Sequence, residues 1–421
     1  MIFLVLGVGI DQVEGISEAK GMGLYTIGLD GDEEAEGARL VDEFYRVNVK
    51  NLEEVEEFVR NCGRKIDAVI AFGVDIPDIL AKVAEITGCY YQLSYEMAKL
   101  SKNKYLSKRL LEEAGVRVPP YAGVRSPEDV KRFASKFGFP VVLKPVDNSG
   151  SRGVLYLEEG ADLEWAFAES FKFVRNRDND PPLIVERFIS GQQLSTESII
   201  MDGKLYTVGL SDRNYELLEK YKPLIVENGG DLPPELHPRY SNYADLISAI
   251  DEQLIKAVRA FGSGNGTIKG DIVVDEDGNV WILEVAFRLS GGLFSSIEIP
   301  KNTGVNFLRK AIEIQLCGRC GVDDLNYRIQ NYVRLRYLFT DRRSGVVREV
   351  VLPDISDAVF KVYCKKGDSL SKFNSLFNLP LVKLVGYVVW GKTREDMLKK
   401  DEFIRNFLRV ECDFGLCDLS S

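Results

Sequence analysis

The alternation of apolar and polar positions over residues 1–95 predicts a repeating order of strand and helix. Apolar runs with the length of buried strands occupy 2–8, 24–30 and 67–73, and helices are expected at 12–22, 52–61 and 77–87. Strands that alternate with helices favour a parallel, doubly wound sheet. We therefore predict that the chain begins with an α/β domain of this kind.

A β-hairpin is predicted within 267–292, where the turn DEDGN at 275–279 separates two runs rich in apolar residues. Asp271 and Glu284 interrupt the two strands at comparable distances from the turn, so their carboxylates could point at a common spot. Carboxylates on core strands are costly without a compensating positive charge. Magnesium is the natural candidate because it prefers oxygen ligands. The alternative is a surface hairpin with ordinary charged residues.

Two basic residues stand where they could meet an anion. Lys144 interrupts the apolar strand PVVLKPV and precedes the glycine- and serine-rich loop DNSGSRGV, an arrangement suited to phosphate binding. The alternative is a mobile surface loop with a lysine that reaches solvent. Arg288 follows the second strand of the hairpin and precedes Ser290, Gly291 and Gly292, so it would face an anion beside the metal.

The rest of the pattern predicts further helices and strands. A helix is expected over KLSKNKYLSKRLLEEAG, where most of the lysines are interpreted as a solvated basic face. Other helices are predicted at 163–176, 243–261, 304–317 and 394–410. A hairpin that turns at 202–203 places Gln193, Ser195 and Glu197 on one face. From about residue 321 the composition is rich in strands.

Composition and charge exclude several classes of protein. The 421 residues have a net charge of −10 and a pI near 5.1, which argues against nucleic-acid binding dominated by phosphate contacts. The apolar opening MIFLVLGVGI is too short to span a bilayer and lacks a basic leader, so no membrane association and a cytoplasmic location are expected. The 7 cysteines are interpreted as packed thiols, with a zinc site at Cys317, Cys320, Cys412 and Cys417 as the alternative.

The only histidine, His237, lies in the proline-rich run LPPELHPRY and is predicted to be a solvated loop residue. Any chemistry that needs a pair of histidines is thereby excluded. The first turn, GVGIDQ at 7–12, is similar to a dinucleotide-binding fingerprint, with Asp30 at the end of the second strand, but Gln12 replaces the third glycine. Nicotinamide binding, a tight turn, and a site for a small anionic substrate all remain open for this segment.

Taken in order, these motifs resemble the ATP-grasp superfamily over about residues 1–320. The resemblance rests on a lysine before LLEEAGVRVP, a strand lysine before a glycine-rich loop, then ERFISG, and finally a hairpin with D…EVAFRLSGG. KKGD and GYVVWGKTRED resemble the C-terminal module of biotin carboxylase and of purine-pathway ATP-grasp enzymes. The resemblance implies a mixed α/β and α+β protein with an N-terminal domain at 1–95, an ATP-grasp domain at 96–320 with a lid at about 122–187, and a C-terminal α+β module at 321–421.

The resemblance also implies roles for particular residues. The expected ATP-binding residues are Lys104, Lys144, Asn148, Ser149, Gly150, Ser151, Gly153, Glu186, Arg187, Phe188, Ile189, Gln193 and Glu197. Asp271 and Glu284 would bind Mg²⁺, or Mn²⁺, while Arg288 and Lys144 would serve catalysis. The expected substrate-binding residues are Gly9, Gln12, Asp75, Arg288, Ser290, Gly291 and Gly292. The chain departs from the family pattern at Ala286, where a third metal ligand is usual, and at Gln193, where a ribose-binding acid is common.

The activity implied is that of a carboxylate–amine, or carboxylate–thiol, ligase that activates a small, amino-acid-like carboxylate as an acyl phosphate and releases ADP and phosphate. Small-molecule substrates and a homodimer are expected. The alternatives are a purine-biosynthesis-type ligase or carboxylating enzyme, a nicotinamide oxidoreductase, and a nucleotide-binding protein without catalysis, which a metal site lost at Ala286 would favour.

Overall fold

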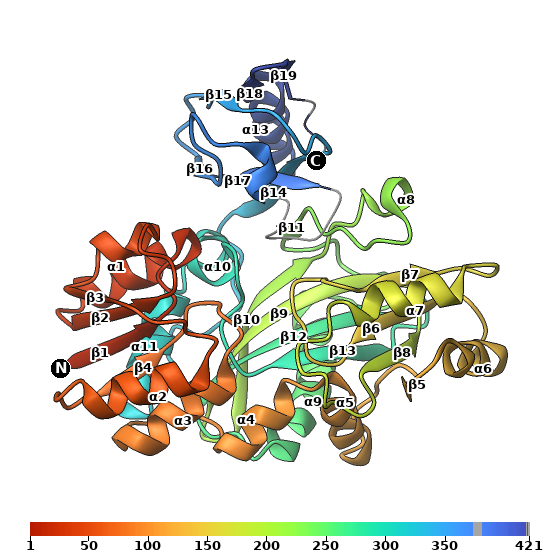
Figure 1. The fold of residues 1–421 in the computed structure, drawn as a ribbon, viewed down its shortest axis with the longest axis horizontal. Coiled ribbons are helices and arrows are strands. Elements are labelled where there is room, and N and C mark those ends of the chain that lie inside the picture. The colour runs from red at the N-terminus through yellow and green to blue at the C-terminus, as the bar shows by residue number, and fades with distance from the viewer. Residues whose placement is uncertain (374–380, 418, 420–421) are drawn as a thin grey trace. The chain divides into compact units, whose positions relative to one another are not determined.

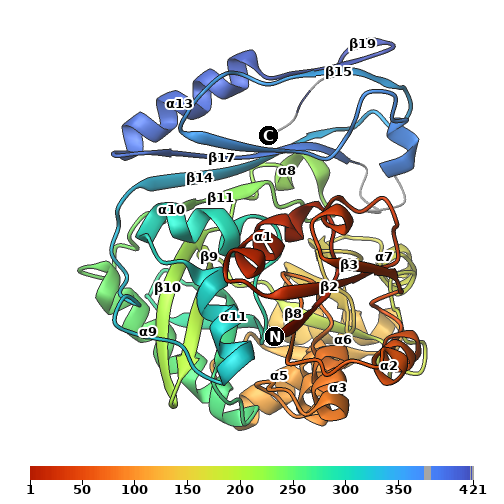
Figure 2. The same ribbon diagram turned by 90° about the vertical axis from the view of Figure 1, so that its left-hand side faces the viewer.

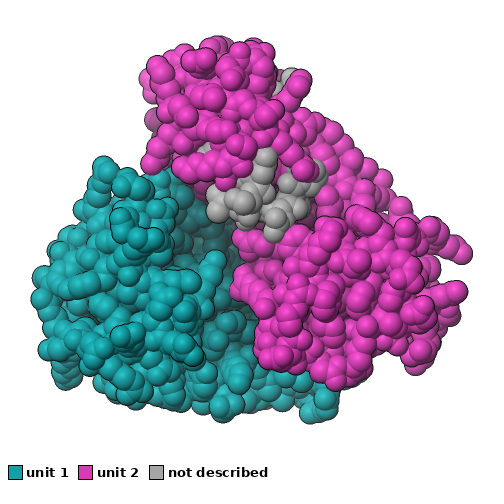
Figure 3. Space-filling view, in the orientation of Figure 1, with its two compact units in different colours: residues 1–118, 190–210, 236–328 teal, residues 119–189, 211–235, 329–421 magenta. Residues whose placement is uncertain are grey.

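The computed structural model describes residues 1–373, 381–417 and 419, which form two compact units, coloured separately in Figure 3. Unit 1 consists of residues 1–118, 190–210 and 236–328, and unit 2 of residues 119–189, 211–235 and 329–421. The division into domains at residues 95 and 320 stays a proposal. In the described part of the chain, no helix is long and apolar enough to cross a membrane.

Unit 1 begins with the predicted parallel sheet, in the order β3-β2-β1-β4 (Figure 1). Its strands are β1 (Ile2–Leu6), β2 (Tyr25–Asp30), β3 (Glu43–Arg46) and β4 (Ala68–Ile70), and its helices are α1 (Val13–Gly21), α2 (Leu52–Asn61) and α3 (Pro77–Thr87). Strand β3 was not predicted, because EFYR is short and half exposed and has no apolar run. Helix α11 (Phe307–Cys317) contacts β4 and α1, so a distant segment of the chain completes this layer.

The second sheet of unit 1 contains the two predicted hairpins in the order β10-β9-β12-β13 (Figure 1). These are β9 (Gln192–Met201), β10 (Lys204–Asp212), β12 (Gly266–Val274) and β13 (Val280–Ala286). Helix α9 (Tyr243–Ala260) packs on this sheet through a core that includes Leu246, Ile250, Leu254 and Ile272. Both hairpin predictions are confirmed because alternation and turn chemistry agree over each of them.

The single helix predicted within 96–122 was wrong, because the chain forms α4 (Tyr95–Ser101) and α5 (Lys104–Glu113). The side chain of Asn103 accepts hydrogen bonds from the backbone of Tyr105 and Leu106 and so begins a new helix. Lys104 is therefore the first residue of α5. The helix predicted at 304–317 is preceded by two short helical segments, a π-helical turn (Phe294–Glu298) and α10 (Ile299–Thr303). A proline lies in the first turn of α10, and Gly304 ends that helix.

The first part of unit 2 is an antiparallel sheet in the order β5-β8-β6-β7. Its elements are β5 (Tyr121–Val124), α6 (Pro127–Phe137), β6 (Val141–Pro145), β7 (Leu155–Leu157), α7 (Leu163–Phe171) and β8 (Leu183–Arg187). The two helices cover the sheet through a core that includes Val130, Phe133, Leu143 and Ala166. Lys144 lies in β6, and the predicted glycine-rich loop follows that strand.

The second part of unit 2 is a sheet in the order β11-β14-β17-β16, made of β11 (Gly229–Leu232), β14 (Tyr332–Thr340), β17 (Val382–Gly391) and β16 (Ala358–Val362). Helix α13 (Arg394–Phe407) packs along β17 (Figure 2). A smaller sheet contains β15 (Val347–Val351), β18 (Arg409–Cys412) and β19 (Gly415–Leu416). Strand β11 was not predicted, although it supplies one edge of the larger sheet, and the short α8 (Leu218–Tyr221) precedes it.

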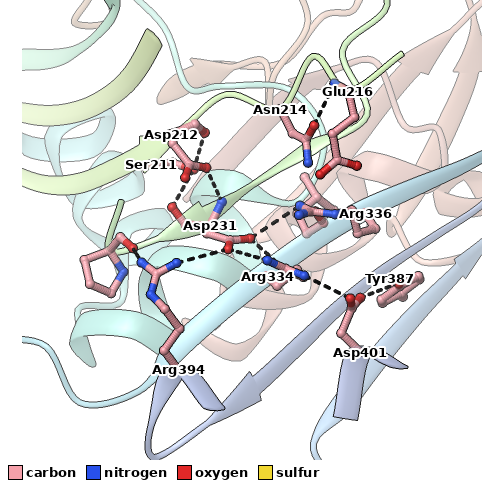
Figure 4. A network of polar contacts seen from close by, with 12 residues as sticks. Ser211, Asp212, Asn214, Glu216, Asp231, Arg334, Arg336, Tyr387, Arg394 and Asp401 are labelled. Carbon is pink, nitrogen blue, oxygen red and sulfur yellow. Dashed lines mark hydrogen bonds and ion pairs between the residues drawn. The ribbon is translucent and has the colours of Figure 1, made fainter. Parts of the chain in front are cut away.

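A cluster of charged groups holds β11 to β14 and α13 within unit 2 (Figure 4). The Asp231 carboxylate accepts two hydrogen bonds from Arg334, at 2.8 and 2.7 Å, and lies 3.4 Å from both Arg336 and Arg394. Arg334 also donates to Asp401 of α13 at 2.9 Å. These groups are mostly buried, so each depends on its partners for compensation.

Candidate active site

One face of the sheet in unit 1 gathers the predicted metal-binding carboxylates. Asp271 of β12 is paired directly with Glu284 of β13, and with Ser195 of β9 on its other side. Directly paired residues project from the same face of a sheet. The strand register therefore brings both carboxylates to one side, as the sequence predicted.

Each of the two carboxylates has a lysine partner. The Lys104 ammonium lies 2.8 Å from Glu284, and the Lys269 ammonium lies 2.8 and 2.6 Å from the two oxygens of Asp271. The Ser195 hydroxyl donates to Asp271 at 3.1 Å. The donor set fits a hard divalent cation, because two partly exposed carboxylates on one face supply anionic oxygens. The ammonium groups of Lys104 and Lys269 beside them are suited to binding phosphate.

Lys269 was missed by sequence reasoning, although a signal for it was present. It stands two residues before Asp271 on the same strand, and the period-two rule places such residues on the same face. The hairpin prediction considered only the two acidic residues, Asp271 and Glu284. The structure adds this lysine to the group formed by Lys104, Asp271 and Glu284.

Arg288 and Asp75 form the next part of this group. The Arg288 Nε donates to the Asp75 carboxylate at 2.9 Å, and the arginine side chain is 14% exposed. Burial alone would raise the pKa of Asp75, but the Arg288 guanidinium and the Lys104 ammonium outweigh it and hold that pKa at about 2. Two predicted substrate-binding residues from distant segments are thus in direct contact.

Glu197 anchors the loop that contains Ser290, Gly291 and Gly292. It is fully buried, and its Oε1 accepts hydrogen bonds from the backbone N–H of Ser290 at 2.5 Å and the hydroxyl of Ser295 at 3.0 Å. Burial raises the pKa of Glu197 to about 7, although the hydrogen bonds from Ser290 and Ser295 lower it in part. An ATP contact for Glu197 stays a prediction, and this anchoring contact is an additional role.

The loop at 290–291 also lies close to the backbone at Gly73. A Cβ atom at Gly73 would lie 2.7 Å from the Cα of Gly291 and 2.8 Å from the carbonyl oxygen of Ser290. Gly73 has a φ of +77°, in the left-handed region that favours glycine. Only a residue without a side chain permits this approach.

The polar groups of the first turn of the chain form hydrogen bonds within the protein. The Gln12 side chain donates to the carbonyl of Phe72 at 2.9 Å, which connects two loops at the ends of β1 and β4. The Asp30 carboxylate accepts from the backbone N–H of Val8 at 2.9 Å. Asp30 therefore binds the backbone of the first turn at Val8, a structural role that weakens the nicotinamide alternative.

The predicted nucleotide-binding residues of unit 2 form a separate group within that unit. Lys144 and Glu186 form an ion pair at 2.8 Å, with side chains 10% and 4% exposed. Asn148 donates to the carbonyl of Phe173 at 2.7 Å and accepts from the backbone of Ser149. These contacts fix the start of the loop that the sequence predicted to bind phosphate.

The remaining predicted residues lie on the same elements. Gly150 and Ser151 have φ values of +66° and +55°, so the glycine-rich loop turns sharply there, before Gly153. Arg187 ends β8 and Phe188 follows it, and their backbone N–H groups donate to the carbonyls of Pro120 and Pro140, respectively. Ile189 is the last residue of this segment of unit 2, and Gln193 lies on β9 of unit 1, paired with Val273.

Two minor predictions have different outcomes. His237 is not a solvated residue: it is 9% exposed, and its Nδ1 accepts a hydrogen bond from the backbone of Arg239, because the proline-rich run folds back on α9 and the hairpin turn. Among the described residues, no group of three or more His, Cys, Asp or Glu side chains could hold a metal ion. The zinc alternative at the cysteines therefore lacks a ligand cluster there.

One family model matches the central part of the chain. Residues 101–292 match the family model of the ATP-grasp domain. A D-alanine--D-alanine ligase from Trichlorobacter lovleyi is 29% identical over 188 residues, which cover 44% of this chain and 55% of that protein. The chain thus spans little more than half the length of this curated relative.

Solved structures show the same fold over nearly the whole chain. An L-amino acid ligase from Bacillus licheniformis has a TM-score of 0.77 at 16% identity, covering 97% of this chain and 98% of that one. A biotin carboxylase from Campylobacter jejuni, solved as a beta-gamma-ATP complex, has a TM-score of 0.76 at 17% identity, covering 99% of this chain and 92% of that one. At these identities the likeness shows the fold, and the mixed α/β and α+β class predicted from the sequence is confirmed.

Proposed function

Because residues 101–292 match the model of the ATP-grasp domain, we propose that this chain is an ATP-dependent ligase that joins a small, amino-acid-like carboxylate to an amine. ADP and phosphate would be the other products. The match to a D-alanine--D-alanine ligase supports an amino-acid-like acid, and the same proposal includes a homodimer in the cytoplasm.

The observation that carries the proposal is the grouping of charges on one face of unit 1. Asp271 and Glu284 lie there with Lys104 and Lys269, and Arg288 follows two residues after the end of β13. Phosphoryl transfer needs positioning and charge neutralisation more than a side-chain nucleophile. This group offers both, without a histidine or cysteine.

The proposed reaction follows from the poor reactivity of a carboxylate toward an amine. A carboxylate oxygen attacks the γ-phosphorus of ATP, the bond to the β-phosphate oxygen breaks, and an acyl phosphate and ADP form. The amine nitrogen then attacks the acyl carbon, loses a proton, and expels phosphate. Mg²⁺ or Mn²⁺ bound by Asp271 and Glu284 would neutralise phosphate charge.

The residues of the chain have separate proposed tasks in this reaction. Lys104 binds phosphate oxygens, and Arg288, held by Asp75, orients the carboxylate or the acyl phosphate. The backbone at 290–292, anchored on Glu197, lines the substrate position. In unit 2, Lys144 and the loop at 148–153 bind ATP phosphates, and Glu186 with the backbone at 187–189 binds adenine.

A phosphate-release screen tests the proposal directly. The chain is incubated with Mg²⁺ and ATP against a panel of amino acids offered as acids and as amines, and ADP is measured. Exchange of ¹⁸O from the β–γ bridge of ATP, with the acid but no amine, would report the acyl phosphate. We expect acid-dependent exchange and ADP release only when both substrates are present.

Two outcomes would overturn the proposal. Incorporation of ¹³C-bicarbonate with ADP formation would indicate the carboxylating alternative. Nucleotide binding without turnover on any pair of substrates, in a chain with intact Asp271 and Glu284, would indicate a nucleotide-binding protein without catalysis. The Glu284→Gln variant, which keeps the side-chain volume, is the control that must lose substrate-dependent ADP release.

A further inference from the structure

Lys269 stands directly opposite Ala286 in the pairing of β12 with β13. Both residues project from the face that carries Asp271 and Glu284, since residues two apart on a strand share a face. Position 286 therefore borders the pair of carboxylates. It offers a methyl group there, with no oxygen that could bind a cation.

The Lys269 ammonium lies on the Asp271 carboxylate, on the same face of the sheet as Ala286. It contacts both oxygens of Asp271, at 2.8 and 2.6 Å, and its side chain is only 12% exposed. On the other side of β12, Lys269 is paired with the buried Glu197. The strand pairing thus fixes the backbone position of Lys269, and the Asp271 carboxylate fixes the position of its ammonium.

Lys104 differs from Lys269 in its backbone position and in the contact that its ammonium makes. It comes from the first turn of α5 and contacts one oxygen of Glu284. Its position is not set by the register of the sheet. Of the two lysines, Lys269 is therefore the one that is built into the carboxylate face next to Ala286.

We propose that Lys269 takes the place of a second divalent cation, so that this chain binds one metal ion with its nucleotide. The small side chain of Ala286 leaves the lysine room and removes an oxygen ligand, and the ammonium supplies positive charge where a second ion would lie. Repulsion between the ammonium and a second cation works in the same direction. The proposal rests on the proposed function, because it assumes that Asp271 and Glu284 bind a metal ion with ATP.

Counting bound Mn²⁺ tests this without any turnover. Equilibrium dialysis with Mn²⁺ and a non-hydrolysable ATP analogue gives the number of ions per bound nucleotide, and the electron paramagnetic resonance spectrum reports coupling between neighbouring Mn²⁺ ions. We expect one ion per nucleotide and no coupling in the unaltered chain. The Lys269→Met/Ala286→Asn double variant should bind two coupled ions, because it removes the ammonium and supplies an amide oxygen.

Single variants and a matched control separate the causes. Ala286→Asn alone should stay at one ion because Lys269 still occupies the position, and Lys269→Arg should also stay at one. Lys102→Met removes a lysine that lies 2.9 Å from both oxygens of Asp78, a similar ion pair elsewhere in unit 1, and should stay at one ion. Circular dichroism of each variant confirms that it is folded.

The outcomes are distinguishable. Two ions per nucleotide in the unaltered chain, or a folded double variant that still binds one, would overturn the role of Lys269 and leave the proposed function intact. Absence of both nucleotide and Mn²⁺ binding in the unaltered chain would overturn the proposed function, and this inference with it.

Discussion

At the scale of single residues, several charged groups of the candidate site are buried and depend on their partners. Lys144 and Glu186 show this most clearly, because both side chains are at least 90% buried and their charged atoms lie 2.8 Å apart. Removal of one partner leaves an uncompensated charge inside unit 2. Stability and nucleotide binding therefore have to be measured separately at this pair.

The Lys144→Met variant should lose about 3 kcal/mol of unfolding free energy, the usual cost of an orphaned buried charge, together with ATP binding. Adding Glu186→Leu should restore most of the stability but not the binding. Urea unfolding and equilibrium dialysis with ATP measure the two effects. Lys131→Met, at an exposed position on α6, should change neither. A double variant that binds ATP normally would contradict the assignment of Lys144.

Asp251 predicts a pH dependence of stability in unit 1. Burial raises the pKa of this carboxyl group to about 6, although a 2.5 Å hydrogen bond from the Thr207 hydroxyl lowers it in part. The folded chain therefore holds the proton to higher pH than the unfolded chain does. Below about pH 4 the Asp251 carboxyl group is protonated in both the folded and the unfolded chain, so it does not lower the stability. As the pH rises from about 4 through 6, the unfolded chain loses this proton first and the unfolding free energy falls.

Asp251→Asn should remove this loss. We expect equal stability of the variant and the unaltered chain near pH 4, and a gain of about 1–2 kcal/mol for the variant above pH 7, after allowance for partial exposure. Thermal unfolding across this pH range measures the difference. Glu252→Gln, at the exposed next position, should show no comparable gain.

At the scale of elements, strand-to-helix connections set how closely two loops approach. Gly73 lies between β4 and α3, and its backbone adjoins Ser290 and Gly291. At the other end of α3, Gly88 has nearly the same φ, +74°, but a Cβ atom there would meet no other atom within 4 Å. The two glycines differ only in whether a side chain has room.

Gly88→Ala should therefore cost about 1 kcal/mol of stability, the price of a left-handed alanine, and leave activity unchanged. Gly73→Ala should cost that amount and also displace the loop at 290–291, with a loss of at least about 10-fold in kcat/KM. Thermal unfolding and steady-state kinetics compare the two variants. Equal kinetics for both would show that the loop is not part of the site.

At the scale of the whole molecule, each compact unit is assembled from segments that are far apart in the chain. In unit 2, residues 211–235 supply β11, and the C-terminal segment supplies β14, β17 and α13. Asp231 is the common partner of Arg334, Arg336 and Arg394 (Figure 4). This carboxylate therefore holds the assembled segments of the unit together.

Asp231→Ala should lower the unfolding free energy of unit 2 by about 3–5 kcal/mol, because it leaves three guanidinium groups without their shared partner. Limited proteolysis should then cut the C-terminal segment more readily. Glu395→Ala removes a carboxylate from an exposed pair with Lys399 and should cost less than about 1 kcal/mol. Similar protease resistance in the Asp231→Ala and Glu395→Ala variants would contradict the role of Asp231.

Much of the fold could be predicted from local patterns. The parallel strands β1, β2 and β4, both hairpins and the position of Lys144 followed from apolar runs and turn residues, because these signals are local. Strands β3 and β11 were missed because they are four residues each and have no clear alternation. The break between α4 and α5 was missed because the cap at Asn103 lies within a helix-favouring run.

The sequence by itself determined the residue types, their order and their alternation, and from these came the carboxylate pair, the strand lysine and the resemblance to the ATP-grasp superfamily. Only the tertiary structure decided the partners: Lys269 on Asp271, Lys104 on Glu284, Asp75 on Arg288 and Glu197 under the loop at 290. The physical reason is that alternation is a property of neighbouring residues, whereas a buried charge acquires its partner from whichever distant segment the packing brings within hydrogen-bonding distance.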